Sequence, residues 1–216
     1  MEKEIKGYRI DTCFGPGGCP NRAHFAGRLI GEIESLLAPK NLLTHLKKRV
    51  EGKLKIHHEF RISLADCPNA CSQPQIKDIG IIGACAPAVT ENPCSSCLAC
   101  KDICKEDAIE LTEKERPEID RALCLRCGQC IEVCTTDTLA AGEKGFRVLL
   151  GGKLGRHPKL ARELPGIFSE EEVLEIVEAC VDFYLENSRH GERFAELLKD
   201  SDFEDFCRKF AKETEV

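Results

Sequence analysis

The pattern of apolar and polar residues divides the chain into alternating strands and helices. Residues 53–64 alternate well enough to predict a strand, and residues 76–82 and 145–150 predict two more. Apolar residues recur at helical spacing over residues 21–37, and this predicted helix stops near Pro39. Strands and helices therefore share the first two thirds of the chain.

Further helices are predicted toward the C-terminus. Ser169 and Glu172 form a capping box, which predicts a helix that runs to about Asn187. Residues 191–199 and 202–212 have the spacing of two more helices. The mixed order of strands and helices predicts an α+β fold.

Length and charge narrow the class of protein. A chain of 216 residues can hold one sizeable core, or one domain with a small inserted module. The formal charge is −6, and no basic run offers a surface for nucleic acid or an anionic membrane. No apolar stretch approaches the roughly 20 residues that span a bilayer, and the N-terminus does not resemble a signal peptide. We expect a cytoplasmic protein with small-molecule and protein partners.

Fifteen cysteines are the most informative part of the composition. Without an export signal, tight Cys-x2-Cys spacing favours metal ligation over disulfides. Eight of the cysteines form two copies of the pattern Cys-x2-Cys-x2-Cys-x3-Cys, offset by 30 residues, within residues 91–138. This segment differs from its surroundings, so we predict an inserted module at 91–138 within a discontinuous domain formed by residues 1–90 and 139–216.

The repeated pattern is the spacing that wraps thiolates around [4Fe-4S] clusters. In a two-cluster ferredoxin the fourth cysteine of each run ligates the other cluster, which here gives two sets. One set is Cys94, Cys97, Cys100 and Cys134, and the other is Cys124, Cys127, Cys130 and Cys104. The usual proline after the fourth cysteine is replaced by Lys105 and Thr135. Zinc ribbons are the alternative, although zinc prefers two separated cysteine pairs. Such an insert alone would make an electron carrier, and exposed clusters favour an anaerobic cell.

A second constellation adds four candidate ligands, in the patterns Cys13-x5-Cys19 and Cys67-x3-Cys71. Four thiolates suit one more cubane. With the loop 66–73, the segment 78–83 and the glycine-rich segment 145–158, these motifs resemble the sirohaem and [4Fe-4S] domain of the sulfite and nitrite reductase family. The position of the insert is similar to that in dissimilatory sulfite reductase subunits.

The resemblance implies the cofactors and the reaction. Cys13, Cys19, Cys67 and Cys71 would bind the coupled cluster, and Cys71 would bridge it to the iron of sirohaem. The complement would be three [4Fe-4S] clusters and one sirohaem. Electrons would then pass in single steps from the insert to the haem, as the six-electron reduction of sulfite to sulfide or of nitrite to ammonia requires. An electron-donor protein would be a partner.

Basic residues would complete the site that the resemblance implies. Sirohaem is a polycarboxylate that needs cations and backbone N–H groups, and each candidate could also be an ordinary surface charge. These candidates are Lys153, Arg156, His157 and Arg22, with His24 and Lys77 as further possibilities. Substrate cations polarise the oxygens of a small anion such as sulfite or nitrite. The candidates for this role are Arg61, Lys53, Lys55 and His58, with Glu59 replacing one cation of the family.

The sequence also departs from the family. A complete repeat begins with a ferredoxin-like half, but only twelve residues precede Cys13. We therefore expect a homodimer or a partner subunit that completes the site. The alternatives are a non-catalytic electron-transfer subunit or redox sensor, and a polyferredoxin without haem. Cys85 could face the cofactor or be a buried thiol, whereas Cys180 and Cys207 are expected in the core.

Overall fold

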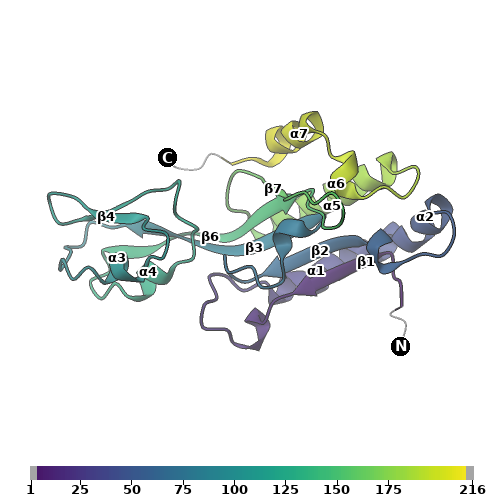
Figure 1. Ribbon diagram of the computed structural model, residues 1–216. Coiled ribbons are helices and arrows are strands. Elements are labelled where there is room, and N and C mark those ends of the chain that lie inside the picture. Colours follow the sequence, from purple (N-terminus) through teal and green to yellow (C-terminus); the bar gives the residue numbers. More distant parts are fainter. Residues whose placement is uncertain (1–3, 213–216) are drawn as a thin grey trace.

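A mixed five-stranded sheet forms the body of the molecule in the computed structural model, which describes residues 4–212. The strand order is β1-β2-β3-β6-β7. β1, β2 and β3 are parallel, and β6 runs antiparallel to both β3 and β7. The strands are β1 (Tyr8–Thr12), β2 (Phe60–Ala65), β3 (Ile79–Val89), β6 (Leu139–Leu150) and β7 (Arg162–Glu163). The mixed helix and sheet architecture predicted from the sequence is confirmed (Figure 1).

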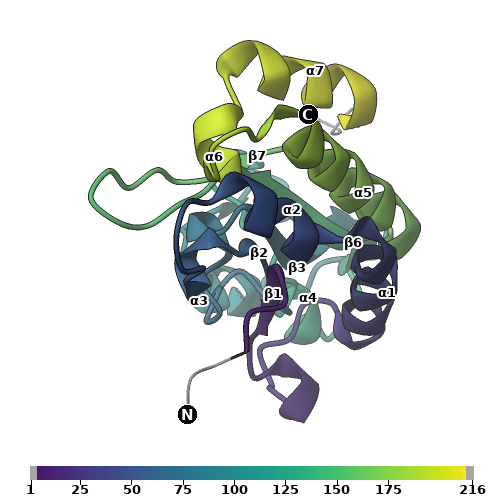
Figure 2. The same ribbon diagram turned by 90° about the vertical axis from the view of Figure 1, so that its right-hand side faces the viewer.

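Two helices cover one face of this sheet. α1 (Gly27–Leu37) and α5 (Glu170–Asn187) lie side by side there (Figure 2). Alternate residues of β2, such as Ile62 and Leu64, enter the same core as Leu29 of α1. The shorter helices α2 (Leu42–Arg49), α6 (Phe194–Leu197) and α7 (Asp200–Phe210) complete the body. None of the helices in residues 4–212 is both long and apolar enough to cross a membrane.

The opposite face of the sheet carries loops and the 3-10 turn Pro74–Ile76 instead of α-helices, and we call it the helix-free face. The Ser63 hydroxyl donates to the Ser72 carbonyl at 2.9 Å, and the Ser72 hydroxyl donates to the Leu64 carbonyl at 2.7 Å. A Cβ at Gly80 would lie 2.4 Å from the Pro74 carbonyl oxygen, so only glycine lets the chain approach so closely. The loop that follows β2 is thus pressed flat against the sheet.

Residues 90–138, which we call the insert, form a separate unit at the tip of the β3–β6 hairpin, on the left of Figure 1. Its elements are α3 (Ala99–Ile103), β4 (Ile109–Leu111), β5 (Pro117–Ile119) and α4 (Gln129–Glu132). Arg121 Nη1 donates to the Pro87 carbonyl at 2.8 Å, and Arg116 donates to the Asn92 and Thr90 carbonyls. Arg121 therefore fixes the insert to the hairpin, and Arg116 holds the first residues of the insert in place. Its ferredoxin character and the domain division stay predictions.

Several element boundaries differ from the predicted ones. The predicted strand 53–64 is wrong in its first half, because Ile56–His58 form a 3-10 turn and β2 begins only at Phe60. The predicted helix 21–37 begins at Gly27, because the residues before it contact the Cys67 loop. The helix that Ser169 caps is confirmed, and the Glu172 amide donates to the Ser169 hydroxyl at 3.3 Å.

The last two predicted helices exist but shift. The helix expected over 191–199 shortens to α6, and the one expected over 202–212 runs from Asp200 to Phe210. β1 and α2 were not predicted from the sequence. β1 is five residues long and only half-buried, so its periodic signal is weak.

Candidate metal centre

Parallel pairing of β1 with β2 brings the first two cysteine loops together. Thr12 and Leu64 are in register at the carboxyl ends of these strands, so the loops that follow leave the sheet at the same edge. The Cys13 amide donates to the Leu64 carbonyl at 3.1 Å, and the Asp66 amide lies 3.3 Å from Cys13 Sγ. The Cys13–Cys19 loop therefore faces the Cys67–Cys71 loop.

These four cysteines, the body set, interact electrostatically. Burial raises the pKa of the Cys67 thiol, and the charges of Cys19, Cys13 and Cys71 raise it further. Cys67 is buried and Cys71 is exposed. The Asn69 side-chain amide donates to Cys71 Sγ at 3.5 Å. A bound cation would stabilise four thiolates that otherwise repel one another, since metals bind the deprotonated form of cysteine.

Asp66 locks the two loops in place. Its Oδ1 accepts from the Ala26 amide at 3.2 Å, and its backbone carbonyl accepts from Ala23 and His24. Its Oδ2 is buried with no hydrogen-bond partner among the described residues, and burial raises the pKa of this carboxyl. A Cβ at Gly15 would lie 2.1 Å from Oδ2, which explains a glycine at this position.

The insert brings its cysteines together in the two crossed sets that the pattern predicts. In one of them, which we call the outer set, burial raises the pKa of Cys100, and the charges of Cys94 and Cys134 raise it further. Backbone amides donate to two of these sulfurs, from Ser96 to Cys94 at 3.4 Å and from Leu139 to Cys134 at 3.3 Å. The outer set is Cys94, Cys97, Cys100 and Cys134, of which Cys97 is exposed.

The inner set is the more buried of the two. Burial raises the pKa of Cys130 to about 12, and the charges of Cys124, Cys127 and Cys104 contribute to the rise. The Arg126 amide donates to Cys124 Sγ at 3.4 Å, as Ser96 does to Cys94 in the other repeat. The inner set is Cys104, Cys124, Cys127 and Cys130. In each set, the fourth cysteine of one run lies beside the first three of the other.

The donor chemistry of each set fits an iron-sulfur cubane. Each set offers four thiols, and amide N–H groups point at ligand sulfurs, an interaction that tunes such clusters. Within residues 4–212, no three Cys, His, Asp or Glu side chains close around a single metal ion. A cubane requires a wider set, because each thiolate binds a different iron. Cluster binding at these particular residues stays a prediction.

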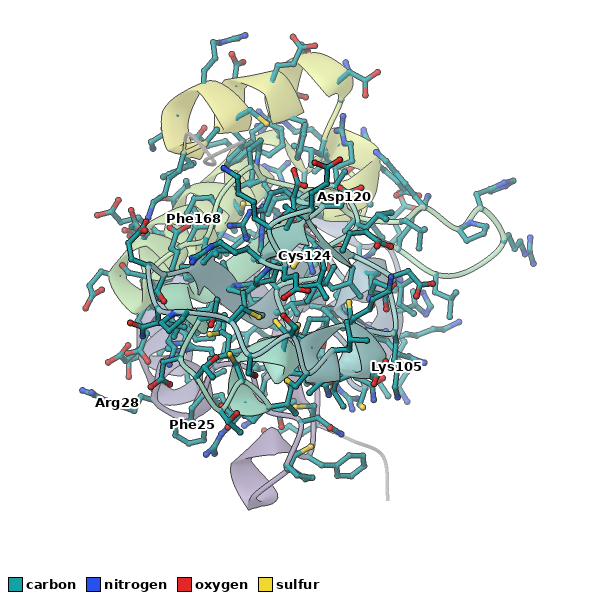
Figure 3. All side chains as sticks on the ribbon, turned by 90° about the vertical axis from the view of Figure 1, so that its left-hand side faces the viewer. Phe25, Arg28, Lys105, Asp120, Cys124 and Phe168 are labelled. Carbon is teal, nitrogen blue, oxygen red and sulfur yellow. The ribbon has the colours of Figure 1, made fainter. Side chains whose placement is uncertain are left out.

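A cavity of about 230 Å³ connects the inner set with the body set. Its wall contains all four inner cysteines and, from the body, Cys67, Pro68 and Asn69. Gln129 Nε2 donates to Asn21 Oδ1 at 3.4 Å, which joins the insert to the Cys19 loop. Figure 3 looks onto this end of the molecule, with Cys124 near the middle and Lys105 toward the edge. The insert and the body therefore meet at their thiols.

The candidate substrate cations occupy different places. Arg61 and Ser63 both lie on the helix-free face, and Ser63 is two residues, or about 7 Å, further along the strand. The Cys71 loop packs against Ser63. Its guanidinium donates to the Ile56 carbonyl at 3.3 Å. Lys55 and His58 form the turn before the strand, where the Lys55 amide donates to His58 Nδ1 at 3.1 Å. Lys53 is exposed ahead of that turn.

Two of the candidate haem cations have other partners. Lys153 Nζ pairs with Glu196 at 2.6 Å, and the Arg22 guanidinium lies 5.1 Å from the centre of the Phe25 ring. Arg156 and His157 are exposed on the loop between β6 and β7, and neither has a polar partner in the described part of the chain. The root of this loop touches the Cys71 loop, because the Gly152 amide donates to the Lys77 carbonyl at 2.8 Å.

A charged cluster on the helix-free face was missed in the sequence. Asp11 Oδ2 accepts from Lys77 Nζ at 2.8 Å, and Asp11 Oδ1 accepts from Arg9 Nε at 2.7 Å. Burial opposes ionisation of Asp11, but the hydrogen bonds from Lys77 and Arg9 leave its pKa lowered. The signal was the alternation of Arg9 and Asp11 two residues apart, just before Cys13.

The remaining residues of interest have structural roles. Glu59 is buried and accepts from the Lys6 amide at 2.8 Å. Its replacement of a family cation stays a prediction. Cys85 is a buried thiol beside the inner set, and its amide donates to the Arg126 carbonyl at 2.7 Å. Cys180 lies in the core as expected, and Cys207 packs against it.

A mixed helix and sheet fold with thiol sets of this kind defines an iron-sulfur protein. Residues 10–216 match the family model described as the nitrite and sulphite reductase 4Fe-4S domain, and the chain belongs to this family. The resemblance seen in the sequence is thereby confirmed.

Known relatives agree with this family. The coenzyme F420-dependent sulfite reductase of Methanocaldococcus jannaschii is 30% identical over 161 residues, which cover 72% of this chain and 26% of that protein. The beta subunit of dissimilatory-type sulfite reductase of Nitratidesulfovibrio vulgaris is 26% identical over 175 residues, which cover 71% of this chain and 46% of that subunit. The crystal structure of dissimilatory sulfite reductase I has a similar fold, with a TM-score of 0.56 at 17% identity, covering 95% of this chain and 52% of that one. The chain thus spans about a quarter to a half of these relatives.

Proposed function

We propose that this chain is the cluster-binding and sirohaem-binding part of a cytoplasmic sulfite or nitrite reductase of an anaerobic cell. The observation that carries the proposal is the cavity shared by the inner set and Cys67. It supports an order of three cubanes in which the inner set lies between the outer set and the body set. When bound, the clusters and sirohaem would supply the single-electron chemistry of a six-electron reduction.

The four cysteines of the body set would have different roles in binding the cluster and the haem. Cys71 is the exposed member, so it is the thiolate available to bridge toward a haem outside the set. The Asn69 amide would orient the Cys71 sulfur, since it already donates to it at 3.5 Å. Cys13, Cys19 and Cys67 would hold the remaining irons of the cluster. Asp66 would keep the two loops at a fixed separation through its bonds to residues 23–26.

Cations on the helix-free face would bind the small oxyanion. Arg61 lies on this face near the Cys71 loop, and Lys77 lies there paired with Asp11. Lys53, Lys55 and His58 are further from the loop, so we assign them a weaker role. A positive charge favours binding of sulfite or nitrite and stabilises charge on its oxygens. A second copy of the chain, or a partner subunit, would add the further cations, and an electron-donor protein would serve the insert.

An electron-transfer subunit or redox sensor is the second candidate function. The engagement of Lys153 by Glu196 and of Arg22 by Phe25 favours it, because these cations would be less available to haem carboxylates. Arg156 and His157 would then carry most of that role. This candidate requires the same three cubanes but no turnover.

The first experiment is anaerobic purification of the protein co-produced with the sirohaem pathway. The expected result is a sirohaem spectrum with about twelve iron atoms and matching acid-labile sulfide per chain, since each of three cubanes holds four irons. Reoxidation of the reduced protein by sulfite or nitrite would then test turnover. Clusters without haem, despite its supply, would favour the electron-transfer candidate.

Cysteine variants test the assignment of the thiols. Cys71→Ser should alter the haem spectrum and stop turnover, whereas the matched control Cys207→Ser should change neither. The double replacement of Cys97 and Cys127 by Ser should remove the insert clusters and spare haem binding. An unchanged haem spectrum and turnover in Cys71→Ser would show that the bridge is assigned to the wrong residue.

A further inference from the structure

The two cysteine repeats carry different side chains on the same backbone turn. Asp107 and Asp137 are equivalent residues 30 positions apart, and both are left-handed, with φ of 51° and 53°. Around Asp137, the second repeat places Thr136 and Thr138, where the first repeat has Glu106 and Ala108. The chain therefore contains its own comparison between a turn with hydroxyls and a turn without them.

The two hydroxyls of the second repeat form a hydrogen-bonded chain that begins at an outer-set thiol. Cys134 Sγ lies 3.7 Å from Thr136 Oγ1, which lies 2.8 Å from Thr138 Oγ1. Thr138 Oγ1 donates to the Pro93 carbonyl at 3.1 Å. Each hydroxyl has one proton to give, so Thr136 must donate to Thr138, and Cys134 must donate its thiol proton to Thr136.

A cysteine binds a metal as its thiolate, so Cys134 in its role as a ligand would reverse this chain. A thiolate has no proton, so Thr136 would otherwise present only lone pairs to a negatively charged sulfur. Rotation of two hydroxyl groups removes the conflict: Thr136 donates to Cys134, and Thr138 donates to Thr136 instead of Pro93. No heavy atom has to move. The bond gained is charge-assisted and is therefore stronger than the neutral bond to the Pro93 carbonyl.

We propose that Thr136 is a positioning residue that donates to the Cys134 thiolate and raises the reduction potential of the outer cluster. The inference rests on the proposed function, because it needs a cluster on the outer set. Hydrogen bonds to ligand sulfurs stabilise the reduced, more negative state. The Leu139 amide, 3.3 Å from the same sulfur, acts in the same direction.

The inner set lacks this device. Ala108 has no hydroxyl, and Glu106 places an exposed carboxylate where Thr136 stands in the other repeat. In the described part of the chain, no group donates a hydrogen bond to Cys104 Sγ, the counterpart of Cys134 Sγ. The hydroxyl chain is therefore a property of the outer set, and its removal should leave the inner cluster unaffected.

The test is a redox titration of the anaerobic protein with all its clusters, followed by electron paramagnetic resonance. Thr136→Val keeps the shape of the side chain and removes the hydroxyl. We expect the midpoint potential of one insert cluster to fall while the other is unchanged. Thr136→Ser should restore it. Thr138→Val should not lower the potential, because Thr136 can still donate to Cys134.

A reciprocal pair of variants tests the same bond at the inner set. Glu106→Thr introduces a hydroxyl at the equivalent turn, and Glu106→Val removes the same charge without adding a hydrogen-bond donor. The potential of the inner cluster should be higher in Glu106→Thr than in Glu106→Val. This comparison also decides the matter if Thr136→Val fails to assemble its clusters.

Three results would overturn the inference, and they can be distinguished. Equal outer-cluster potentials in the wild type and in Thr136→Val, with full iron and sulfide in both, would show that the hydroxyl does not act on Cys134. Equal inner-cluster potentials in the two Glu106 variants would show that a threonine hydroxyl at this turn does not act on the ligand sulfur. Absence of insert clusters from the wild-type protein would instead remove the proposed function, and the inference with it.

Discussion

Replacement of Gly80 by Ala tests how tightly the Cys71 loop must lie on the sheet. Gly80 is the second residue of β3 and lies on the helix-free face, directly beneath Pro74. An added Cβ would lie 2.4 Å from the Pro74 carbonyl oxygen, whereas ordinary contact begins at 3.4 Å. The difference, 3.4 − 2.4, means that the backbone at Pro74 must retreat by 1.0 Å. Pro74 is only three residues after Cys71, so this retreat reaches the proposed bridging thiolate.

The size of the effect follows from the backbone nature of the contact. Backbone cannot swing aside as a flexible side chain can, and the neighbouring Gln75 carbonyl is held by the Ala161 amide at 2.8 Å. Overpacking of this kind costs about 1–3 kcal/mol. For a chain of this length that corresponds to a fall in melting temperature of roughly 2–12 °C. We also expect loss of iron from the body set, about four atoms per chain.

Thermal unfolding of the anaerobic protein and its iron content measure these two effects. Gly31→Ala is the matched control, because Gly31 lies inside α1 with nothing within 4 Å of the added Cβ. Alanine in a helix interior should stabilise the control by about 0.5–1 kcal/mol. If Gly80→Ala had the same melting temperature as the wild type and kept all its iron, the close approach of the loop would not be needed to hold Cys71.

Two further predictions concern stability. Burial lowers the pKa of His45 below its ordinary value of 6.5, and the positive charge of Arg49 lowers it further. As the pH falls, the histidine of the unfolded chain therefore takes up a proton before that of the folded chain. His45 thus contributes stability above about pH 6.5 that declines below it, and in urea unfolding at several pH values His45→Phe should flatten the decline. Arg193→Met should cost about 3 kcal/mol in the same assay, because the Asp78 carboxylate, fully buried and 2.8 Å from Arg193 Nη2, loses its cation. Asp78→Asn in that background should recover part of the loss, and no recovery would contradict an electrostatic origin.

The sequence determined the features that depend on neighbours along the chain. Cys-x2-Cys spacing keeps the two Cα atoms within about 10 Å of each other even in an extended chain, so the ligand candidates of the insert could be recognised directly. The capping box at Ser169 satisfies helix amides within three residues, and α5 begins where it predicts. The motifs around Cys13, Cys67 and Gly152 identified the family for the same reason, because each is a short contiguous pattern.

Only the tertiary structure decided how distant segments meet. Parallel pairing of β1 with β2 places Cys13 beside Asp66, 53 residues away, and no local pattern specifies that pairing. The pairing of Lys153 with Glu196 depends equally on how α6 packs. Spacing along the chain fixes local geometry because few bonds separate neighbours. Contacts across the sheet depend on strand order and loop closure, which arise from burial of the whole core.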